Sequence, residues 1–425
     1  MKTTIAPDAT AATPASRSTF IESLARRLVL GRLQELRHGE LRIVDGSDVF
    51  NFGSASGSDA PRVSIEVLNP QFYVEVAFGG TVGVGGAYID SYWRCERLTD
   101  LIRLFVLNRD AMNGLDRRWA TLRAPLIRAV HWMNRNTHSG SRRNIAAHYD
   151  LGNDLYRLML DETMAYSCGI YTSDTATLAD ASRAKFDAAC RKLDLKPDDH
   201  LLEIGTGWGG LAVHAAQHYG CRVTTTTISR EQYAYARDQV EKLGLRGRVT
   251  LLLEDYRNLS GQYDKLVSIE MIEAVGARFL DTYVAKCSSL LKHSGAMLLQ
   301  AITIQDQFYR QALRSVDYIQ HYVFPGSFIP SVSAITDSVR RVTDLKLYHL
   351  EDIGPHYART LAEWRRNFFQ HIAEVRRLGY SDRFVRLWEF YLCYCEGGFA
   401  ERAIGDVQML LTKPGSRRAP LPSLG

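Results

Sequence analysis

The sequence has no long apolar run, no secretory signal and no low-complexity tract outside its two ends. No window approaches eighteen uninterrupted apolar residues, so we predict no membrane-spanning helix. Residues 1–18 are rich in Ala and Thr and lack an apolar core and cleavage site, and we expect them to form a mobile cytosolic tail. With 46% hydrophobic and 23% charged residues over 425 positions, the chain should fold into at least two domains.

The cysteines lack the paired spacing of a zinc site, and nothing in the sequence indicates an oxidising compartment. We therefore expect reduced thiols and no metal. The seven cysteines are Cys95, Cys168, Cys190, Cys221, Cys287, Cys393 and Cys395.

The net charge of +5 arises in residues 1–149, which hold 19 Lys/Arg against 14 Asp/Glu. Between residues 115 and 149 there are seven arginines and one acid, with Trp119 and Trp132 among them. Arginine and tryptophan together suit an anionic membrane surface, although a solvated helix face beside a linker would have the same composition. Nucleic acid is disfavoured as a partner because no nucleic-acid-binding motif accompanies the charge.

The residue patterns divide the chain into five parts. We expect a mobile tail, an N-terminal domain, a basic helical connector, a larger second domain and another mobile tail, over 1–18, 19–114, 115–145, 146–413 and 414–425. Within the N-terminal domain the patterns predict a helix, three short strands and a second helix, over 20–36, 41–44, 63–68, 73–78 and 98–107. The glycine-rich residues 79–86 should form a sharp turn.

In the second domain, apolar runs of strand type alternate with helical stretches. The predicted strands are 201–204, 223–227, 249–253, 265–269 and 296–302. This alternation predicts an α/β fold in which helices cover both faces of a doubly wound parallel sheet. The smaller N-terminal domain, with its helices and short strands, is predicted to be α+β.

The first of these strands runs into a glycine-rich turn that contains Gly205, Gly207 and Gly209, and then into a helix. Glycines let a backbone approach a ligand closely and place it at the start of a helix. Alone, such a turn is shared by many nucleotide-binding folds. A dinucleotide-binding domain should offer an acid about twenty residues later, but residues 224–227 are all threonine, so nicotinamide binding is disfavoured.

Acidic residues stand near the ends of these strands. Glu203 lies at the end of the first strand, and Glu254 and Asp255 follow the third. The carboxyl ends of parallel strands open onto a ligand crevice. The arrangement resembles the class I methyltransferase fold, in which the glycine turn packs against the methionine part of S-adenosylmethionine and an acid after a later strand meets the adenine.

A set of short motifs resembles the cyclopropane-fatty-acyl-phospholipid synthase family and its mycolic-acid-modifying relatives. In family order the motifs are 148–154, 164–168, 205–210, 227–232, 255–257, 273–276, 322–325 and 395–399, so the resemblance covers about residues 146–413. Residues 86–93 also resemble the lipid-facing domain of the bacterial synthases, which the shorter mycolate enzymes lack. The resemblance implies an S-adenosylmethionine-dependent methyltransferase with a lipid-facing N-terminal domain.

The resemblance also implies which residues form the site. The cofactor contacts would be Tyr166, Ser167, Glu203, Gly205, Gly207, Gly209, Thr227, Gln232, Glu254 and Asp255. The family holds a bicarbonate ion in its active site, and the ligands here would be Cys168, Glu273, Gln300, Ile302 and Tyr322. Gln300 stands where the family has a histidine, and its amide can donate a hydrogen bond to an anion but carries no positive charge.

The chemistry of the family explains why it needs such a site. Methyl transfer to an isolated alkene leaves a carbocation in the acyl chain, which must be kept from water and then lose a proton. Bicarbonate would accept that proton while Glu273 and Tyr322 orient it, and the Tyr322 ring would also stabilise the cation. Glu270 is close enough in sequence to be the inward-pointing carboxylate instead of Glu273.

The candidate catalytic residues are Glu273, Tyr322, Cys395 and Cys168. Cys395 matches a family active-site residue, but its aromatic-rich surroundings would equally suit a buried, inert thiol. The many aromatic residues of 305–331 would suit either a core or the cap of a lipid tunnel.

The expected function is formation of a cyclopropane ring in unsaturated phospholipid acyl chains. Three alternatives remain open: a fatty-acyl methyltransferase with a methyl-branched or methylene product, a lipid-binding protein with a degenerate domain, and a small-molecule methyltransferase. The intact glycines and Glu273 argue against the second alternative. The expected partners are an anionic phospholipid membrane surface and an unsaturated acyl chain, the expected location is cytoplasmic at the inner membrane, and the family makes a homodimer plausible.

Overall fold

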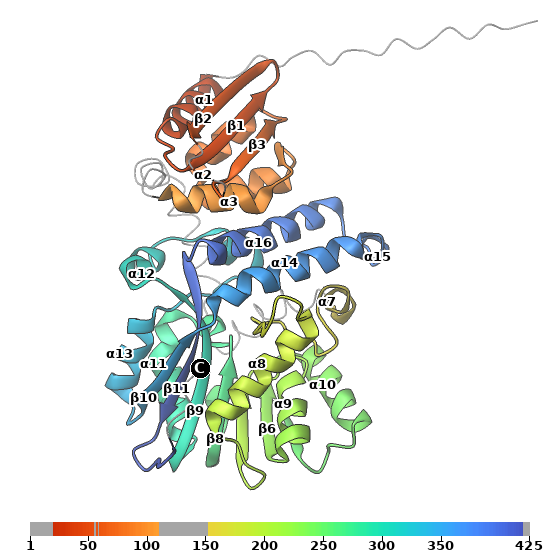
Figure 1. Ribbon diagram of the computed structural model, residues 1–425, viewed down its shortest axis with the longest axis vertical. Coiled ribbons are helices and arrows are strands. Elements are labelled where there is room, and N and C mark those ends of the chain that lie inside the picture. The colour runs from red at the N-terminus through yellow and green to blue at the C-terminus, as the bar shows by residue number, and fades with distance from the viewer. Residues whose placement is uncertain (1–19, 55–56, 58, 110–151, 420–425) are drawn as a thin grey trace, which may run out of the picture.

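The computed structural model describes residues 20–54, 57, 59–109 and 152–419 (Figure 1). These residues form two sheets with helices around them, and the smaller sheet lies at one end of the molecule (Figure 1). The tail expected over 1–18 and the basic connector expected over 115–145 lie outside the described residues, as do residues 420–425. Nothing in the structure therefore bears on the connector or the first tail.

The smaller sheet has four strands in the order β2-β1-β3-β4 and packs against three helices. Its domain consists of α1 (Phe20–Leu33), β1 (Gly39–Asp45), β2 (Asp48–Ser54), β3 (Arg62–Val67), α2 (Gln71–Ile89), β4 (Trp93–Cys95) and α3 (Leu98–Leu107). Strand β1 is antiparallel to β2 and parallel to β3. Leu41 and Ile43 point from β1 into the core, as expected for a strand with one buried face.

One prediction for this domain is wrong. Residues 73–78 are not a strand and 79–86 are not a turn, because both segments lie in α2. The run is apolar or small at nearly every position, so its pattern does not distinguish a strand from a helix. The helix bends at Gly80, whose φ of 54° and ψ of −142° are not helical. The other predicted helices and strands of the domain are confirmed, whereas β2 has no counterpart among the predictions.

Helix α2 has the length and hydropathy to cross a membrane, and no other helix in the described part of the chain does. Half of its apolar window is nevertheless buried inside the protein. The Trp93 indole donates a hydrogen bond to the Val84 carbonyl over 3.2 Å, and the Tyr88 ring packs against Phe390 of the second domain. These are the contacts of a core helix.

The larger sheet has seven strands in the order β10-β11-β9-β8-β5-β6-β7. Their bounds are β5 (His200–Ile204), β6 (Arg222–Thr227), β7 (Val249–Leu253), β8 (Tyr263–Ile269), β9 (Leu291–Ile304), β10 (Lys346–Asp352) and β11 (Ile404–Thr412). Strands β5 to β9 are parallel, and β11 runs antiparallel between β9 and β10. All five strands predicted for this domain and its doubly wound α/β fold are confirmed.

Helices cover both faces of the larger sheet. Helices α8, α9 and α10 pack on one face, and α11 and α13 pack on the other. In β5, Leu201 is buried in the core with the first group of helices, and the adjacent Leu202 is buried in the core with the second group. The helices of this domain are α7 (Asn153–Met159), α8 (Leu178–Leu193), α9 (Gly210–His214), α10 (Arg230–Lys242), α11 (Leu280–Ser289), α12 (Asp306–Ala312), α13 (Val332–Val342), α14 (Gly354–Gln370), α15 (Ile372–Arg377) and α16 (Asp382–Ala400). Five short helical turns are η1 (Ala215–Tyr219), η2 (Tyr256–Asn258), η3 (Ile272–Ala274), η4 (Ala277–Phe279) and η5 (Ile319–Val323).

The two long helices α14 and α16 lie between the two sheets (Figure 1). Their buried residues belong to one continuous hydrophobic core with those of α1, α2 and α3. The Tyr88 hydroxyl donates a hydrogen bond to Glu389 of α16 over 2.8 Å. A Cβ on Gly397 would lie 2.8 Å from the Ile102 side chain, so this glycine allows α16 to approach α3 closely. The domains therefore share a buried interface.

Candidate active site

A cavity of about 1360 Å³ runs from the carboxyl ends of the parallel strands into the N-terminal domain. The glycine turn after β5 lines one part of it, and buried carboxyl groups after β8 line the next. Beyond them the wall consists of aromatic side chains and then of apolar side chains from α1, β1, β3, α2 and α3. A single cavity therefore connects three chemically different regions, a polar turn, an acidic cluster and an apolar tunnel.

The glycine turn forms the first region. Gly205, Gly207 and Gly209 have φ values of 103°, 52° and 91°, which residues other than glycine rarely adopt. A Cβ on Gly205 would lie 3.1 Å from the Met271 side chain, whereas one on Gly207 would meet nothing within 4 Å. The backbone at Gly207 is thus open to the cavity, as a ligand held against a glycine turn requires.

Side chains that the resemblance assigns to the cofactor surround this turn. Tyr166, Ser167, Thr227, Gln232 and Glu254 all line the cavity. The Thr227 hydroxyl donates a hydrogen bond to the side-chain oxygen of Gln232 over 2.9 Å, so these two side chains hold each other in place. Hydroxyls, an amide and a carboxylate are the groups that the polar parts of S-adenosylmethionine need, and the residues present fit that cofactor.

Glu203 and Asp255 also line the cavity, but protein groups already engage their carboxyl groups. Glu203 accepts a hydrogen bond from the Thr225 hydroxyl over 2.6 Å, and burial raises its pKa to about 8. Asp255 accepts hydrogen bonds from the backbone amide and the guanidinium of Arg257. Asp255 therefore shapes the turn after β7, and Glu254 is the neighbouring carboxylate at the cavity.

Lys185 is a residue of this region that the sequence patterns missed. It lies on α8, is 1% exposed, and donates a hydrogen bond from its ammonium to the Ser167 hydroxyl over 2.6 Å. Burial lowers the pKa of Lys185. The sequence does contain a feature that could have identified Lys185: it lies on the buried face of an amphipathic helix, four residues from both Ala181 and Ala189. A buried cation at the cavity can pair with an anionic group of a ligand.

Glu270, directly after β8, is the centre of the acidic cluster. Its Oε1 accepts hydrogen bonds from the Cys168 backbone amide and the Gln300 side-chain amide, both over 2.8 Å. Its Oε2 accepts a hydrogen bond from the Tyr357 hydroxyl over 2.5 Å. Burial raises the pKa of Tyr357 well above its usual value, so that hydroxyl keeps its proton and remains a donor. Three donors from distant segments therefore converge on one carboxylate.

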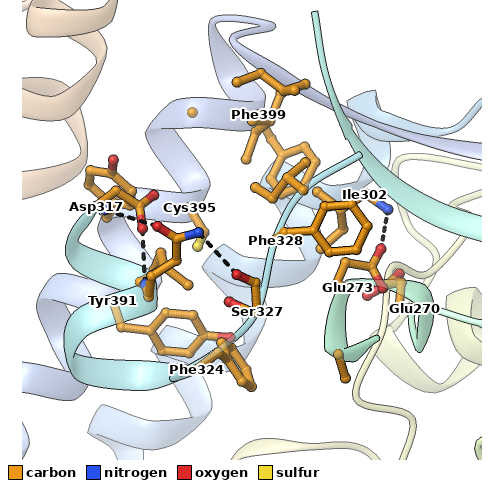
Figure 2. Close-up of a pocket in the computed structure, with 18 of the residues that line it drawn as sticks. Glu270, Glu273, Ile302, Asp317, Phe324, Ser327, Phe328, Tyr391, Cys395 and Phe399 are labelled. Carbon is orange, nitrogen blue, oxygen red and sulfur yellow. Dashed lines mark hydrogen bonds between the residues drawn. The ribbon is translucent and has the colours of Figure 1, made fainter. Parts of the chain in front are cut away.

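Glu273 lies beside Glu270 in Figure 2, with one oxygen facing the backbone amide of Ile302 over 2.5 Å. Its other oxygen is buried and has no hydrogen-bond partner among the described residues. Burial, and then the charge of Glu270, raise the pKa of Glu273 to about 8. Glu273 is therefore mostly protonated at neutral pH. Both glutamates that the sequence left as candidates point into the cavity.

Asp406 of β11 is a third carboxyl group in this cluster. It is fully buried and lies opposite Ile302 in the register of β11 with β9. The Gln300 amide donates a hydrogen bond to Asp406 over 3.0 Å as well as to Glu270, so it links the two carboxyl groups. Burial, and then the nearby charge of Glu270, raise the pKa of Asp406 well above its usual value.

Tyr322 packs against Tyr318 and close to α2, and the role expected for it stays a prediction. Its ring centroid lies 5.2 Å from that of Tyr318, and its hydroxyl is 2.7 Å from where a Cβ on Gly86 would be. Tyr322 is not among the described residues that line the cavity. The hydroxyl at the acidic cluster belongs to Tyr357 of α14, bonded to Glu270. Tyr357 was not among the predicted site residues, because the apolar residues of its helix have only the periodicity of a core helix.

The two candidate cysteines carry neutral thiols. Cys168 is fully buried, and its thiol faces the Gly169 carbonyl over 3.3 Å, so only its backbone amide serves Glu270. Cys395 lines the cavity from α16, on the side of Asp317 and apart from the two glutamates (Figure 2). Burial raises the pKa of both thiols, so neither is poised as a thiolate nucleophile.

The aromatic segment 305–331 contributes both to the core and to the cavity wall. Tyr318 is fully buried in the core. Phe308, Phe324 and Phe328 line the cavity, and Figure 2 shows Phe328 close to the glutamates. The segment therefore contributes residues to the core and to the wall of the cavity, and its role as the cap of a lipid tunnel stays a prediction.

Comparisons with known proteins identify the family of this chain. Residues 136–409 match the family of mycolic acid cyclopropane synthetase. The chain is 36% identical over 376 residues to the tuberculostearic acid methyltransferase UfaA1 of Mycobacterium tuberculosis, covering 86% of this chain and 87% of that protein. It is 37% identical over 364 residues to the cyclopropane-fatty-acyl-phospholipid synthase of Escherichia coli, covering 85% and 90%.

The crystal structure of the mycolic acid cyclopropane synthase CmaA1 complexed with SAH and CTAB is also similar. It aligns with a TM-score of 0.60 and 28% identity, over 64% of this chain and 98% of its own. Residues 136–409, which match the family, contain the glycine turn, the acidic cluster and the seven-stranded sheet apart from the end of β11. The expected class I methyltransferase fold is therefore confirmed. The chain belongs to the mycolic acid cyclopropane synthetase family of S-adenosylmethionine-dependent lipid methyltransferases and cyclopropane synthases.

Proposed function

We propose that this protein transfers a one-carbon unit from S-adenosylmethionine to the cis double bond of an unsaturated phospholipid acyl chain. The single observation that carries the proposal is the continuous cavity, in which the glycine turn, the buried carboxyl groups and an apolar tunnel follow one another. An apolar tunnel suits a hydrocarbon substrate, whereas a small polar methyl acceptor would need polar groups along the wall.

When bound, S-adenosylmethionine supplies a methyl group on a positively charged sulfur. The protein's task is to hold the alkene in line with that methyl carbon, because an isolated alkene is a weak nucleophile. The glycine turn, Gln232 and Glu254 would fix the cofactor, and Lys185 would pair with its carboxylate. Phe328 and the other aromatic wall residues exclude water and present their rings to a developing cation.

The π electrons of the alkene form the new carbon–carbon bond, which leaves a carbocation on the neighbouring carbon of the acyl chain. If a proton leaves the new methyl group at once, its electron pair closes a cyclopropane ring. If a hydride moves to the cation first, loss of the same proton gives a methylene group. Both outcomes need a proton acceptor beside the methyl group.

Ring closure is the first candidate, in line with the similarity to the cyclopropane-fatty-acyl-phospholipid synthase. The second candidate is a methylene or methyl-branched product. It is favoured by Gln300, which replaces the family histidine with a neutral amide, and by the similarity to the tuberculostearic acid methyltransferase.

The partners and location are proposals of the same kind. An anionic membrane surface is supported by Arg310 and Arg314, two exposed cations that line the cavity on the side of the N-terminal domain. We propose a cytoplasmic protein peripherally bound to the inner membrane, with no nucleic-acid partner. The proposal that the protein forms a homodimer rests on the family resemblance alone.

The test is to express the chain in a bacterium that lacks cyclopropane fatty acids and to analyse its fatty acids by mass spectrometry and proton NMR. A gain of about fourteen mass units with upfield ring protons would support ring closure. The same gain without ring protons would support a methylene product, and a gain of about sixteen mass units would support a methyl-branched product. Unchanged lipids beside abundant folded protein would refute the proposal.

A further inference from the structure

The carboxylate of Glu270 is surrounded by hydrogen-bond donors of the kind that bind anions. The Cys168 amide, the Gln300 amide and the Tyr357 hydroxyl all point at its carboxylate, and none of the three is a cation. A carboxylate that accepts several such hydrogen bonds is held in one orientation. Glu270 also lines the cavity, so a substrate can approach it.

The backbone at Glu270 supplies an independent observation. Its φ is 47°, in the left-handed region that residues other than glycine rarely adopt. Such a conformation costs a residue with a side chain about 1 kcal/mol or more and persists where the surroundings impose it. A glycine would relieve this strain, whereas the glutamate is held in the strained conformation by the three hydrogen bonds of its side chain.

The residues around Glu270 do not fit the bicarbonate ion that the family resemblance implies. The Cys168 and Gln300 amides are engaged by Glu270, and the Ile302 amide is engaged by Glu273. A bicarbonate ion would have to displace these carboxyl groups and add a charge beside them in a buried site. The expected bicarbonate ligands are therefore satisfied by the protein's own carboxyl groups.

We propose that Glu270 is a built-in replacement for the bicarbonate ion and accepts the proton that leaves the transferred methyl group. The step rests on the proposed function. A carbon–hydrogen bond of that methyl group breaks, its proton forms an O–H bond with Glu270, and its electron pair completes the ring or the methylene double bond. Solvent takes up the proton after the product leaves, so Glu270 returns to its starting form.

The two carboxyl groups beside Glu270 both have raised pKa values. Burial raises the pKa of Glu273 to about 8 and that of Asp406 well above its usual value, so a cluster with three negative charges is disfavoured. Gln300 is a positioning residue. Its side-chain oxygen accepts a hydrogen bond from Gln408 over 2.9 Å, which turns its NH2 group toward Glu270 and Asp406.

The first test uses turnover of unsaturated phospholipid vesicles in buffer depleted of carbon dioxide. Wild-type turnover should not change when bicarbonate is removed or restored. Glu270→Gly should lower turnover about 100-fold or more, and added bicarbonate or formate should restore part of it by filling the vacated position. Glu270→Gln should be equally slow but not rescued, because its amide fills the same space. Binding of S-adenosylmethionine, measured by calorimetry, should remain within about threefold in both variants.

The second test does not depend on lipid turnover. Carbon-13 NMR of labelled bicarbonate should show line broadening with Glu270→Gly and none with the wild-type protein. Bicarbonate-dependent wild-type turnover, or bicarbonate binding to the wild-type protein, would overturn the assignment of Glu270. Absence of lipid turnover together with the expected NMR contrast would refute the proposed function and support Glu270 as the anion of the site.

Discussion

The two polar ends of the cavity are built in opposite ways. At the cofactor end, Gly205 and Gly207 expose backbone to the cavity, and the neighbouring side chains of Thr227 and Glu254 follow the ends of adjacent parallel strands. At the acidic end, the groups come from segments that are far apart in sequence, among them Cys168, Glu270, Tyr357 and Asp406. A local motif therefore makes the first end, and tertiary packing assembles the second.

Substitutions at the cofactor end and at the acidic end should therefore have different effects. A substitution in the turn alters a backbone surface and should reduce cofactor affinity while leaving the acidic cluster intact. A substitution in the acidic cluster alters a proton or a hydrogen bond and should reduce turnover while leaving cofactor affinity intact. Four predictions, ordered from the largest expected effect to the smallest, probe the two ends.

The largest effect is expected for Gly207→Val. The new side chain would enter the open cavity at a backbone φ of 52°, so S-adenosylmethionine affinity should fall about 100-fold or more by calorimetry. Gly244→Val is the matched control, because Gly244 has a φ of 69° and equally open surroundings but does not line the cavity. Equal affinity losses in the two variants would mean that strain, rather than the filled site, causes the effect.

The next effect separates the two glutamates. Glu270→Gln should reduce turnover about 100-fold or more, because a neutral amide cannot accept the proton. Glu273→Gln should reduce it about tenfold or less, because Glu273 has a pKa of about 8 and is already mostly neutral at pH 7. Single-turnover kinetics with a labelled acyl chain would measure both. A larger loss in Glu273→Gln would transfer the proposed role to that residue.

A smaller effect distinguishes two tyrosines. Tyr357→Phe removes a hydrogen bond to Glu270 and should lower turnover about tenfold without changing cofactor affinity. Tyr322→Phe should leave turnover within about twofold, because Tyr322 is not among the described residues that line the cavity. The reverse order in a steady-state assay would restore the role that the sequence suggested for Tyr322.

The smallest effect concerns stability and pH. The pKa of Glu273 is about 8 in the folded protein against an ordinary value near 4.5, so the folded state binds more protons between these values. Stability should therefore fall as the pH rises from about 5 to 8, by on the order of 1 kcal/mol per pH unit for this group. Glu273→Gln should flatten that dependence in thermal melts, and an unchanged slope would show that Glu273 is ionised in the folded protein.

Local sequence patterns were enough to predict the five parallel strands of the larger sheet and the glycine turn at the cofactor end, but not β10, β11 or Lys185. Strands buried on both faces read as continuous apolar runs, and a glycine turn needs only neighbouring residues, so both leave local patterns. The prediction of a strand at residues 73–78 was wrong, because an apolar segment without a clear period does not distinguish a strand from a helix. The segment forms part of helix α2, whose buried residues pack in the core between the two domains.

The residues of the acidic end could be identified only from the tertiary structure. Asp406 reaches the cluster because β11 runs antiparallel beside β9, which sets Asp406 opposite Ile302. Tyr357 reaches it because α14 packs between the two sheets, whereas Tyr322 faces α2 instead. Contacts between residues about a hundred positions apart depend on strand order and helix packing, and those are properties of the whole fold rather than of any segment.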